Sequence, residues 1–139
     1  MSSVFTKIIN SDLPGYFVWR DEVCVSFLSI NPVSPGHALI VPVMEIDHWL
    51  DLPHEVNSHL MHVAQIVGLA QMAAFNPSRV GMLIAGLEVP HTHLHVIPMQ
   101  GMGDLDLSRA EVSVDHTALA ATAEKLLSAI VRNGHTPEL

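Results

Sequence analysis

The sequence predicts an α+β domain with an antiparallel sheet of about five strands, one long central helix and an extra helix near the C-terminus. Three observations predict it. Residues 15–43 contain short runs of β-branched and aromatic residues separated by turn residues. Residues 53–75 repeat apolar side chains at helical spacing. Two more strand-like runs and a second helical run then follow, so strands and helices are not strictly alternating as in a parallel sheet.

Three strands are expected in the N-terminal part. Residues 15–20 and 22–29 are rich in residues that favour strands, with a hairpin connection between them. Two prolines and a glycine in residues 31–36 predict a loop. Residues 37–43 are apolar at nearly every position, so this strand is expected to lie in the centre of the sheet with both faces buried.

The long helix is expected over residues 53–75, starting near Pro53 and ending at Asn76-Pro77. Its apolar positions are three or four residues apart, which predicts one buried face. Two further strands are expected, at residues 79–85 and 91–99.

A glycine-containing loop is expected over residues 100–107, followed by the last helix. Asp115 is a candidate N-cap of this helix, because its carboxylate can accept from exposed backbone N–H groups. The helix is expected to run to about Arg132, where Asn133-Gly134 gives a suitable C-terminal stop.

The composition favours one compact domain over residues 1–139. Apolar residues make up 49% of the chain and charged residues only 14%, which argues against disorder. With a net charge of −8 and only 6 Lys and Arg, the chain lacks the cation cluster that nucleic acids or anionic membranes require. No apolar run approaches the ~20 residues of a membrane span, and no secretory signal is visible, so a cytoplasmic protein is expected. The single cysteine, Cys24, is expected to be buried and inert.

Histidines are the unusual feature of the composition: there are 10, and three of them alternate in Pro90-His91-Thr92-His93-Leu94-His95. On a strand, alternate side chains share a face, so these three imidazoles are expected on one face and the residues between them on the other. Burying three imidazoles without partners is unfavourable, which indicates a functional row.

Two kinds of chemistry fit this row. A zinc ion could take two neighbouring imidazoles, with His37 and Glu88 as further candidate ligands; three ligands from one straight strand fit poorly, since His91 and His95 would lie roughly 13 Å apart. Alternatively, a neutral imidazole can act as a nucleophile near pH 7 while a neighbouring histidine supplies a proton. A phosphorus centre suits the second arrangement, with His93 as the natural nucleophile.

These residues resemble the histidine-triad signature, in which three histidines alternate with apolar residues and Thr92 is a mild exception. The resemblance extends over residues 4–99, while residues 100–139 form a C-terminal extension without a match. It rests on three further segments: Phe5-Thr6-Lys7-Ile8-Ile9 with Pro14; Phe27-Leu28-Ser29-Ile30-Asn31-Pro32; and Ser34-Pro35-Gly36-His37 with Val41-Pro42.

The resemblance implies an antiparallel sheet with a long helix, commonly in a homodimer, and an enzyme that attacks the α-phosphate of a nucleotide. Nucleoside phosphoramidates, dinucleoside polyphosphates and adenylated conjugates are the implied substrates, and no metal cofactor is required. His93 would be the nucleophile that forms a nucleotidyl-histidine. His95 and His37 would contact phosphate and assist protonation, and His91 would orient the nucleophile.

The implied substrate contacts are Ser29, Ile30, Asn31, Gly86 and Glu88, and the chain departs from the family at several positions. Ser29 stands where an acidic residue often binds the ribose. Ala85, Leu87 and Glu88 stand in a stretch that usually carries amide and hydroxyl groups for phosphate, and Glu45 replaces another family histidine. Glu88 would repel an anionic phosphate if it pointed inward, or would raise the basicity of a triad imidazole. Two alternatives to the enzyme therefore stay open: a non-catalytic nucleotide-binding regulator on the same fold, and a metal-binding module.

Overall fold

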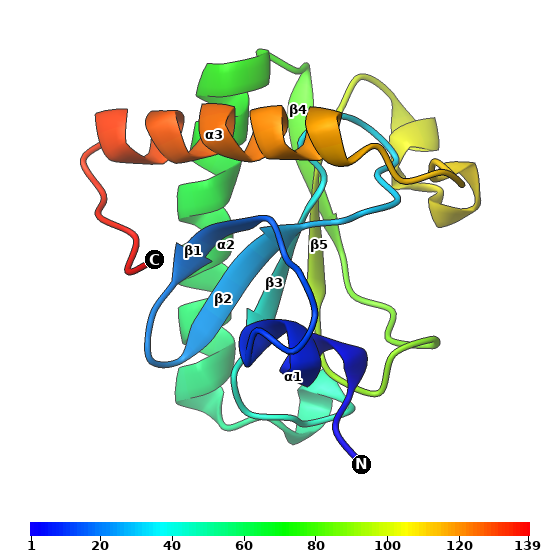
Figure 1. Cartoon of the computed structure of the whole chain (residues 1–139), viewed down its shortest axis with the longest axis vertical. Helices are drawn as coiled ribbons and strands as arrows, with labels where there is room; N and C mark the ends of the chain where they lie inside the picture. Colours follow the sequence, from blue (N-terminus) through cyan, green and yellow to red (C-terminus); the bar gives the residue numbers. More distant parts are fainter.

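A computed structural model describes all residues, 1–139, and contains one five-stranded sheet. The sheet lies between helices (Figure 1). The strand order is β1-β2-β3-β5-β4, and every neighbouring pair is antiparallel. The strands are β1 (Phe17–Arg20), β2 (Cys24–Leu28), β3 (Ala38–Pro42), β4 (Arg79–Leu83) and β5 (Leu94–Met99). The antiparallel α+β class and the central position of β3 are therefore as the sequence predicts, and β3 is buried at all five positions.

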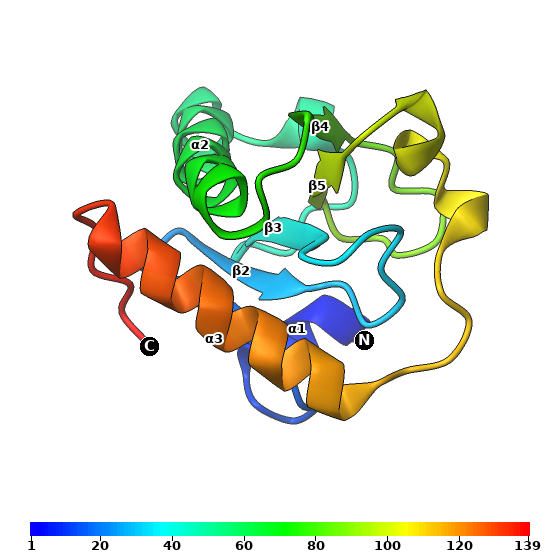
Figure 2. The same ribbon diagram turned by 90° about the horizontal axis from the view of Figure 1, so that it is seen from above.

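Two long helices cover one face of the sheet, α2 (His54–Phe75) and α3 (His116–Arg132) (Figures 1 and 2). The core between them and the sheet includes Leu60 and Val67 from α2, Leu126 from α3, and Leu94 and Val96 from β5. None of the helices combines the length and the apolar character needed to cross a bilayer.

The ends of α3 follow the predicted caps. The Asp115 side chain accepts from the backbone N–H of Ala118, and the helix ends at Arg132 with Asn133 as its C-cap. Gly134 follows with a φ of 95°, a left-handed conformation that glycine adopts without steric cost.

A short helix that the sequence analysis did not predict, α1 (Val4–Ile9), covers the opposite face of the sheet. Phe5 and Ile9 pack there against Phe27 of β2 and Leu39 of β3. With only six residues, α1 carries too little periodicity to be recognised in the sequence. It depends instead on contacts with residues far along the chain.

Several predicted boundaries are wrong, and the important one lies in the triad segment. The strand expected over residues 91–99 begins only at Leu94, because the backbone N–H and Oγ1 of Thr92 both donate to the carbonyl of Ile46 in the loop after β3. His91 and His93 therefore lie on the approach to β5 and not in its ladder. The expected loop over residues 100–107 contains one short 3₁₀ helix, η2 (Met102–Leu105), and a second, η3 (Leu107–Arg109), begins at its last residue.

Candidate active site

All three triad histidines lie on the sheet face that α1 covers, as their alternation predicts. The Phe5 ring of α1 packs edge-on against the His93 ring, with 4.8 Å between the ring centroids, and lies 6.0 Å from that of His91. His95 pairs with Leu39, which belongs to the α1-side core. The three side chains are almost completely buried, with His93 7% and His95 9% exposed.

His93 presents one free ring nitrogen. Its Nδ1 lies 2.7 Å from the backbone carbonyl of His91, and because a carbonyl only accepts, Nδ1 carries the proton. Nε2 of His93 has no hydrogen-bond partner. The fully buried side-chain polar atoms without a partner are Ser26 Oγ and Gln71 Oε1, so His93 Nε2 is not fully buried. Nε2 therefore reaches solvent as an unprotonated nitrogen, which is the state that a nucleophile needs.

His37 and His95 form a chain of hydrogen bonds beside it. The backbone N–H of Val33 donates to Nδ1 of His37 at 3.1 Å, so His37 carries its proton on Nε2. This Nε2–H donates to Nδ1 of His95 at 2.9 Å. Neutral His95 then carries its own proton on Nε2, which also reaches solvent. The His93 and His95 rings are neighbours, with 5.0 Å between their centroids.

Burial keeps these imidazoles neutral. Desolvation, with the neighbouring His95, lowers the pKa of His37 to about 3, and desolvation with the neighbouring His93 lowers the pKa of His95 to about 4. Desolvation also lowers the pKa of His93, although its hydrogen bond to the His91 carbonyl and the nearby Glu88 carboxylate act in the opposite direction. At neutral pH, the imidazoles of His37, His93 and His95 are therefore neutral.

His91 has no ring nitrogen left for a ligand. Its Nε2 donates to the carbonyl of Pro42 at 2.7 Å, and its Nδ1 lies 2.7 Å from Oγ of Ser3. Because both nitrogens are engaged, His91 fits an orienting role better than a role as a metal ligand. Of the two neighbouring pairs that the zinc alternative allows, His93 with His95 is therefore the one left, with His37 and Glu88 as its further candidate ligands.

The candidate phosphate-binding loop lies next to His93. A cavity of about 160 Å³ is lined by His93, Thr92, four loop residues and three residues near η1 (Trp49–Asp51). The loop residues are Ile84, Ala85, Gly86 and Leu87, and the others are Asp47, His48 and Trp49. Gly86 thus lines the same cavity as His93, with a φ of 77° that favours glycine. Glu88 is exposed and acts on His93 through its charge.

Three other sequence-predicted contacts lie elsewhere. Ser29 and Ile30 line a larger cavity, of about 300 Å³, which His37 and the start of α3 also line but His93 does not. The Asn31 side chain donates to the backbone carbonyl of Glu111, at 2.8 Å, in the C-terminal extension. The structure therefore does not bring these residues together with the triad in one cavity.

Sequence reasoning missed the residues that support the histidines from behind. Ser3, Thr6 and Glu45 form a hydrogen-bonded group against His91. Gln71 of α2 donates to the carbonyls of Gly36 and Val96, which adjoin His37 and His95. The replacement of a family histidine by Glu45 was the one available signal, and nothing local marks Gln71.

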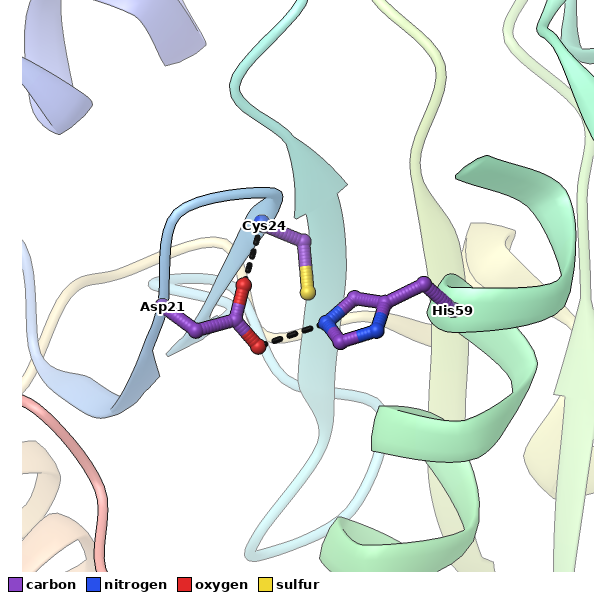
Figure 3. Close-up of side chains that lie close together, drawn as sticks. All are labelled: Asp21, Cys24 and His59. Atoms are coloured by element: carbon purple, nitrogen blue, oxygen red, sulfur yellow. Dashed lines mark hydrogen bonds and ion pairs between the residues drawn. The ribbon is translucent and has the colours of Figure 1, made fainter. Parts of the chain in front are cut away.

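A second group of potential metal ligands lies away from the triad. Asp21, Cys24 and His59 offer ligand atoms that all lie within 4.8 Å of one another (Figure 3). Both Asp21 oxygens, however, already accept two hydrogen bonds each: from the backbone N–H groups of Val23 and Cys24, and from the side chains of Trp19 and His59. Burial raises the pKa of the Cys24 thiol well above its usual range, which disfavours the thiolate that binds metals. The donor set therefore fits a hydrogen-bonded corner of the β1–β2 hairpin.

A comparison with protein-family models matches residues 10–102 to the HIT domain. An uncharacterized HIT-like protein of Borreliella burgdorferi is 36% identical over 103 residues, which cover 68% of this chain and 73% of that protein. The adenosine 5'-monophosphoramidase HNT1 of Saccharomyces cerevisiae is 33% identical over 96 residues, which cover 68% of this chain and 61% of that protein.

Solved structures agree with the fold. The crystal structure of a hypothetical histidine triad nucleotide-binding protein from Sulfolobus tokodaii superposes with a TM-score of 0.80 at 28% identity. The match covers 92% of this chain and 91% of that chain, so it includes most of the C-terminal extension.

Proposed function

The chain belongs to the HIT domain family, and we propose that it is a nucleotide hydrolase or nucleotidyl transferase that attacks the α-phosphate of its substrate through His93. The yeast relative, named as an adenosine 5'-monophosphoramidase, supports a nucleoside phosphoramidate as one substrate. Dinucleoside polyphosphates and adenylated conjugates have the same reacting group, a phosphorus atom bonded to a leaving group.

The observation that carries the proposal is the state of His93. Its Nδ1–H is fixed on the carbonyl of His91 at 2.7 Å, which leaves the lone pair of Nε2 unprotonated at the surface. A solvated histidine would divide its proton between two nitrogens, whereas here one tautomer is selected. This selection supports nucleophilic attack by Nε2 more directly than the presence of three histidines does.

In the first step, Nε2 of His93 would form a bond to phosphorus while the bond from phosphorus to the leaving group breaks. The ring then gains a positive charge, which the His91 carbonyl stabilises by accepting the Nδ1–H. The leaving group requires a proton. An anionic phosphate beside His95 would favour its protonated form, so that His95 takes up a proton with the substrate and gives it to the leaving group from Nε2.

In the second step, water would attack phosphorus and break its bond to His93. Neutral His95 accepts the proton of that water, and His93 leaves in its original neutral state. The hydrogen bond from His37 Nε2–H to His95 Nδ1 sets the tautomer of His95 before the reaction. While His95 carries the extra proton, and after it has given up the proton on Nε2, its Nδ1–H would instead donate to Nε2 of His37, which then carries its own proton on Nδ1. When an alcohol or amine replaces water, the same step gives nucleotidyl transfer. The two proposed steps require no metal, as the family resemblance implies. The homodimer that the same resemblance implies stays a prediction.

The test compares the wild-type protein with His93→Ala on adenosine phosphoramidate, measuring AMP release and the mass of the intact chain. The expected result is AMP release that requires His93 and a trapped mass increment of one adenylate. If neither AMP release nor the mass increment is seen with this substrate or with dinucleoside polyphosphates, although the protein still binds AMP, the proposed enzyme is wrong. The protein would then be a nucleotide-binding regulator. Two observations favour that second function. The Asn31 side chain donates to the Glu111 carbonyl, and the Glu88 carboxylate is exposed.

A further inference from the structure

The imidazole of His91 is held at both ends. Nε2–H donates to the Pro42 carbonyl at 2.7 Å, which leaves Nδ1 of the neutral ring as an acceptor. Ser3 Oγ lies 2.7 Å from this Nδ1, so the serine hydroxyl is the donor. The ring is completely buried, and no water can replace a lost partner without rearrangement. The tautomer of His91 is therefore set by one main-chain carbonyl and one hydroxyl group.

Ser3 is itself fixed from a distant loop. Its Oγ caps α1 by accepting from the backbone N–H of Thr6 at 3.0 Å. Oε1 of Glu45 accepts from the backbone N–H of Ser3 at 2.7 Å and from Oγ1 of Thr6 at 2.6 Å. In a capping box, a glutamate inside the helix accepts from the N-cap N–H. Here the acidic group comes from the loop after β3, and these hydrogen bonds lower the pKa of the Glu45 carboxyl.

The same short helix also contacts the candidate nucleophile. Phe5, two residues after Ser3, packs edge-on against His93. His93 in turn donates its Nδ1–H to the main-chain carbonyl of His91. Any displacement of His91 therefore moves the acceptor that selects the reactive tautomer of His93.

We propose that Ser3, held in place by Glu45, is a positioning residue for His93: its hydroxyl fixes the His91 ring and thereby the His91 carbonyl on which the His93 Nδ1–H is aligned. The expected effect on kcat rests on the proposed function. The expected effect on the tautomers of His91 and His93 can be measured without turnover. Ser3 does not touch the reacting atoms. Its effect is on the fraction of protein in which Nε2 of His93 is unprotonated and correctly oriented.

The test uses the full chain with Ser3→Gly and, as the matched control, Ser3→Thr. Glycine is tolerated at helix N-caps nearly as well as serine, so Ser3→Gly removes the hydroxyl with little effect on α1. Threonine keeps both the cap and the hydroxyl. The two readouts are ¹⁵N–¹H spectra of the histidine side chains, which distinguish imidazole tautomers, and kcat and KM for adenosine phosphoramidate. Thermal unfolding shows whether each variant is folded.

We expect Ser3→Gly to mix the tautomers of His91 and His93 and to lower kcat roughly 10- to 100-fold, as a displaced catalytic group does. KM should stay within about two-fold of the wild-type value, since substrate contacts are unchanged. Ser3→Thr should restore the spectra and kcat. If Ser3→Gly is folded and leaves the spectra of both histidines unchanged, the proposal is overturned.

A second variant, Glu45→Gln, tests the contribution of the Glu45 carboxylate while the Ser3 hydroxyl is kept. Glutamine keeps an oxygen that accepts from Ser3 and Thr6 but removes the charge, so kcat should fall less than in Ser3→Gly. Glu45→Ala removes both hydrogen bonds and should approach the effect of Ser3→Gly. If the wild-type protein does not react although Ser3→Gly changes the histidine spectra, the proposed function fails and the positioning role of Ser3 stands.

Discussion

Nε2 of His37, the residue before β3, lies 2.9 Å from Nδ1 of His95 in β5, and this contact determines which nitrogen of His95 faces solvent. Both rings are buried, and the Val33 N–H orients the chain of donors by binding Nδ1 of His37. Each hydrogen bond in this series therefore has its donor on the side of the loop that contains Val33, and the last N–H is that of His95 Nε2, which faces solvent. The pair joins two neighbouring central strands, so the sheet register itself fixes its geometry.

Replacing His37 tests this chain directly. His37→Ala removes the N–H that holds His95, and the proton of His95 can then move to Nδ1, where it no longer faces solvent. We expect kcat for adenosine phosphoramidate to fall about 10- to 100-fold. His37→Gln, whose amide N–H can donate to His95, should lose less. Equal activity of His37→Ala and the wild-type protein in steady-state assays would contradict this role.

Gln71 supports the same pair from the helical side. Its Nε2 donates to the Gly36 carbonyl at 2.8 Å and to the Val96 carbonyl at 3.0 Å, and the side chain is fully buried. Gln71→Met keeps the volume but removes both donors, so urea unfolding should show a loss of roughly 1–3 kcal/mol. Met72→Leu, at a partly exposed position of the same helix, is the control and should change stability little. A fully stable Gln71→Met protein would show that these two carbonyls do not need the donor.

The sequence is sufficient for most of the fold because the relevant signals are local. β3 shows its central position by being apolar at every position, and Asp115 marks the start of α3 with its own side chain. The helix α1 is missed because the acid that completes its cap, Glu45, lies 42 residues from Ser3. A local pattern cannot contain a partner at that distance.

The site is predictable only in part, for a related reason. Alternation places His93 and His95 on one face, and this holds even though His93 precedes the strand. Protonation states are different, because each depends on a carbonyl or N–H brought in from another segment, such as Pro42 for His91 and Val33 for His37. The family resemblance groups Ser29 and Ile30 with the triad, whereas the fold places them in another cavity.

Acid should destabilise the protein through the buried pair. The pKa of His37 is lowered to about 3 and that of His95 to about 4, from an ordinary value of 6.5. Between pH 6.5 and 4 the unfolded chain therefore binds more protons than the folded one, and stability falls as pH falls. The loss should be roughly 1 kcal/mol per pH unit for each histidine, with full stability above pH 6.5.

Urea unfolding at a series of pH values measures this slope. His95→Gln should make the slope shallower, whereas His54→Gln, at an exposed position, should leave it unchanged. A slope that is the same in wild type and His95→Gln would show that His95 is not held neutral by burial.

Glu88 is the departure from the family whose effect on His93 is electrostatic. Its exposed carboxylate raises the pKa of His93 against the larger lowering by desolvation, and it also repels an incoming phosphate. Glu88→Gln should therefore lower the pKa of His93, so that the acidic limb of the kcat/KM profile moves to lower pH. KM for an anionic nucleotide should fall about two-fold at low salt, and less at high salt.

Glu124→Gln, which removes the same charge from the exposed side of α3, is the matched control and should change neither quantity. An acidic limb that moves to higher pH in Glu88→Gln would mean that Glu88 acts on substrate binding by contact and not through the charge it places near His93.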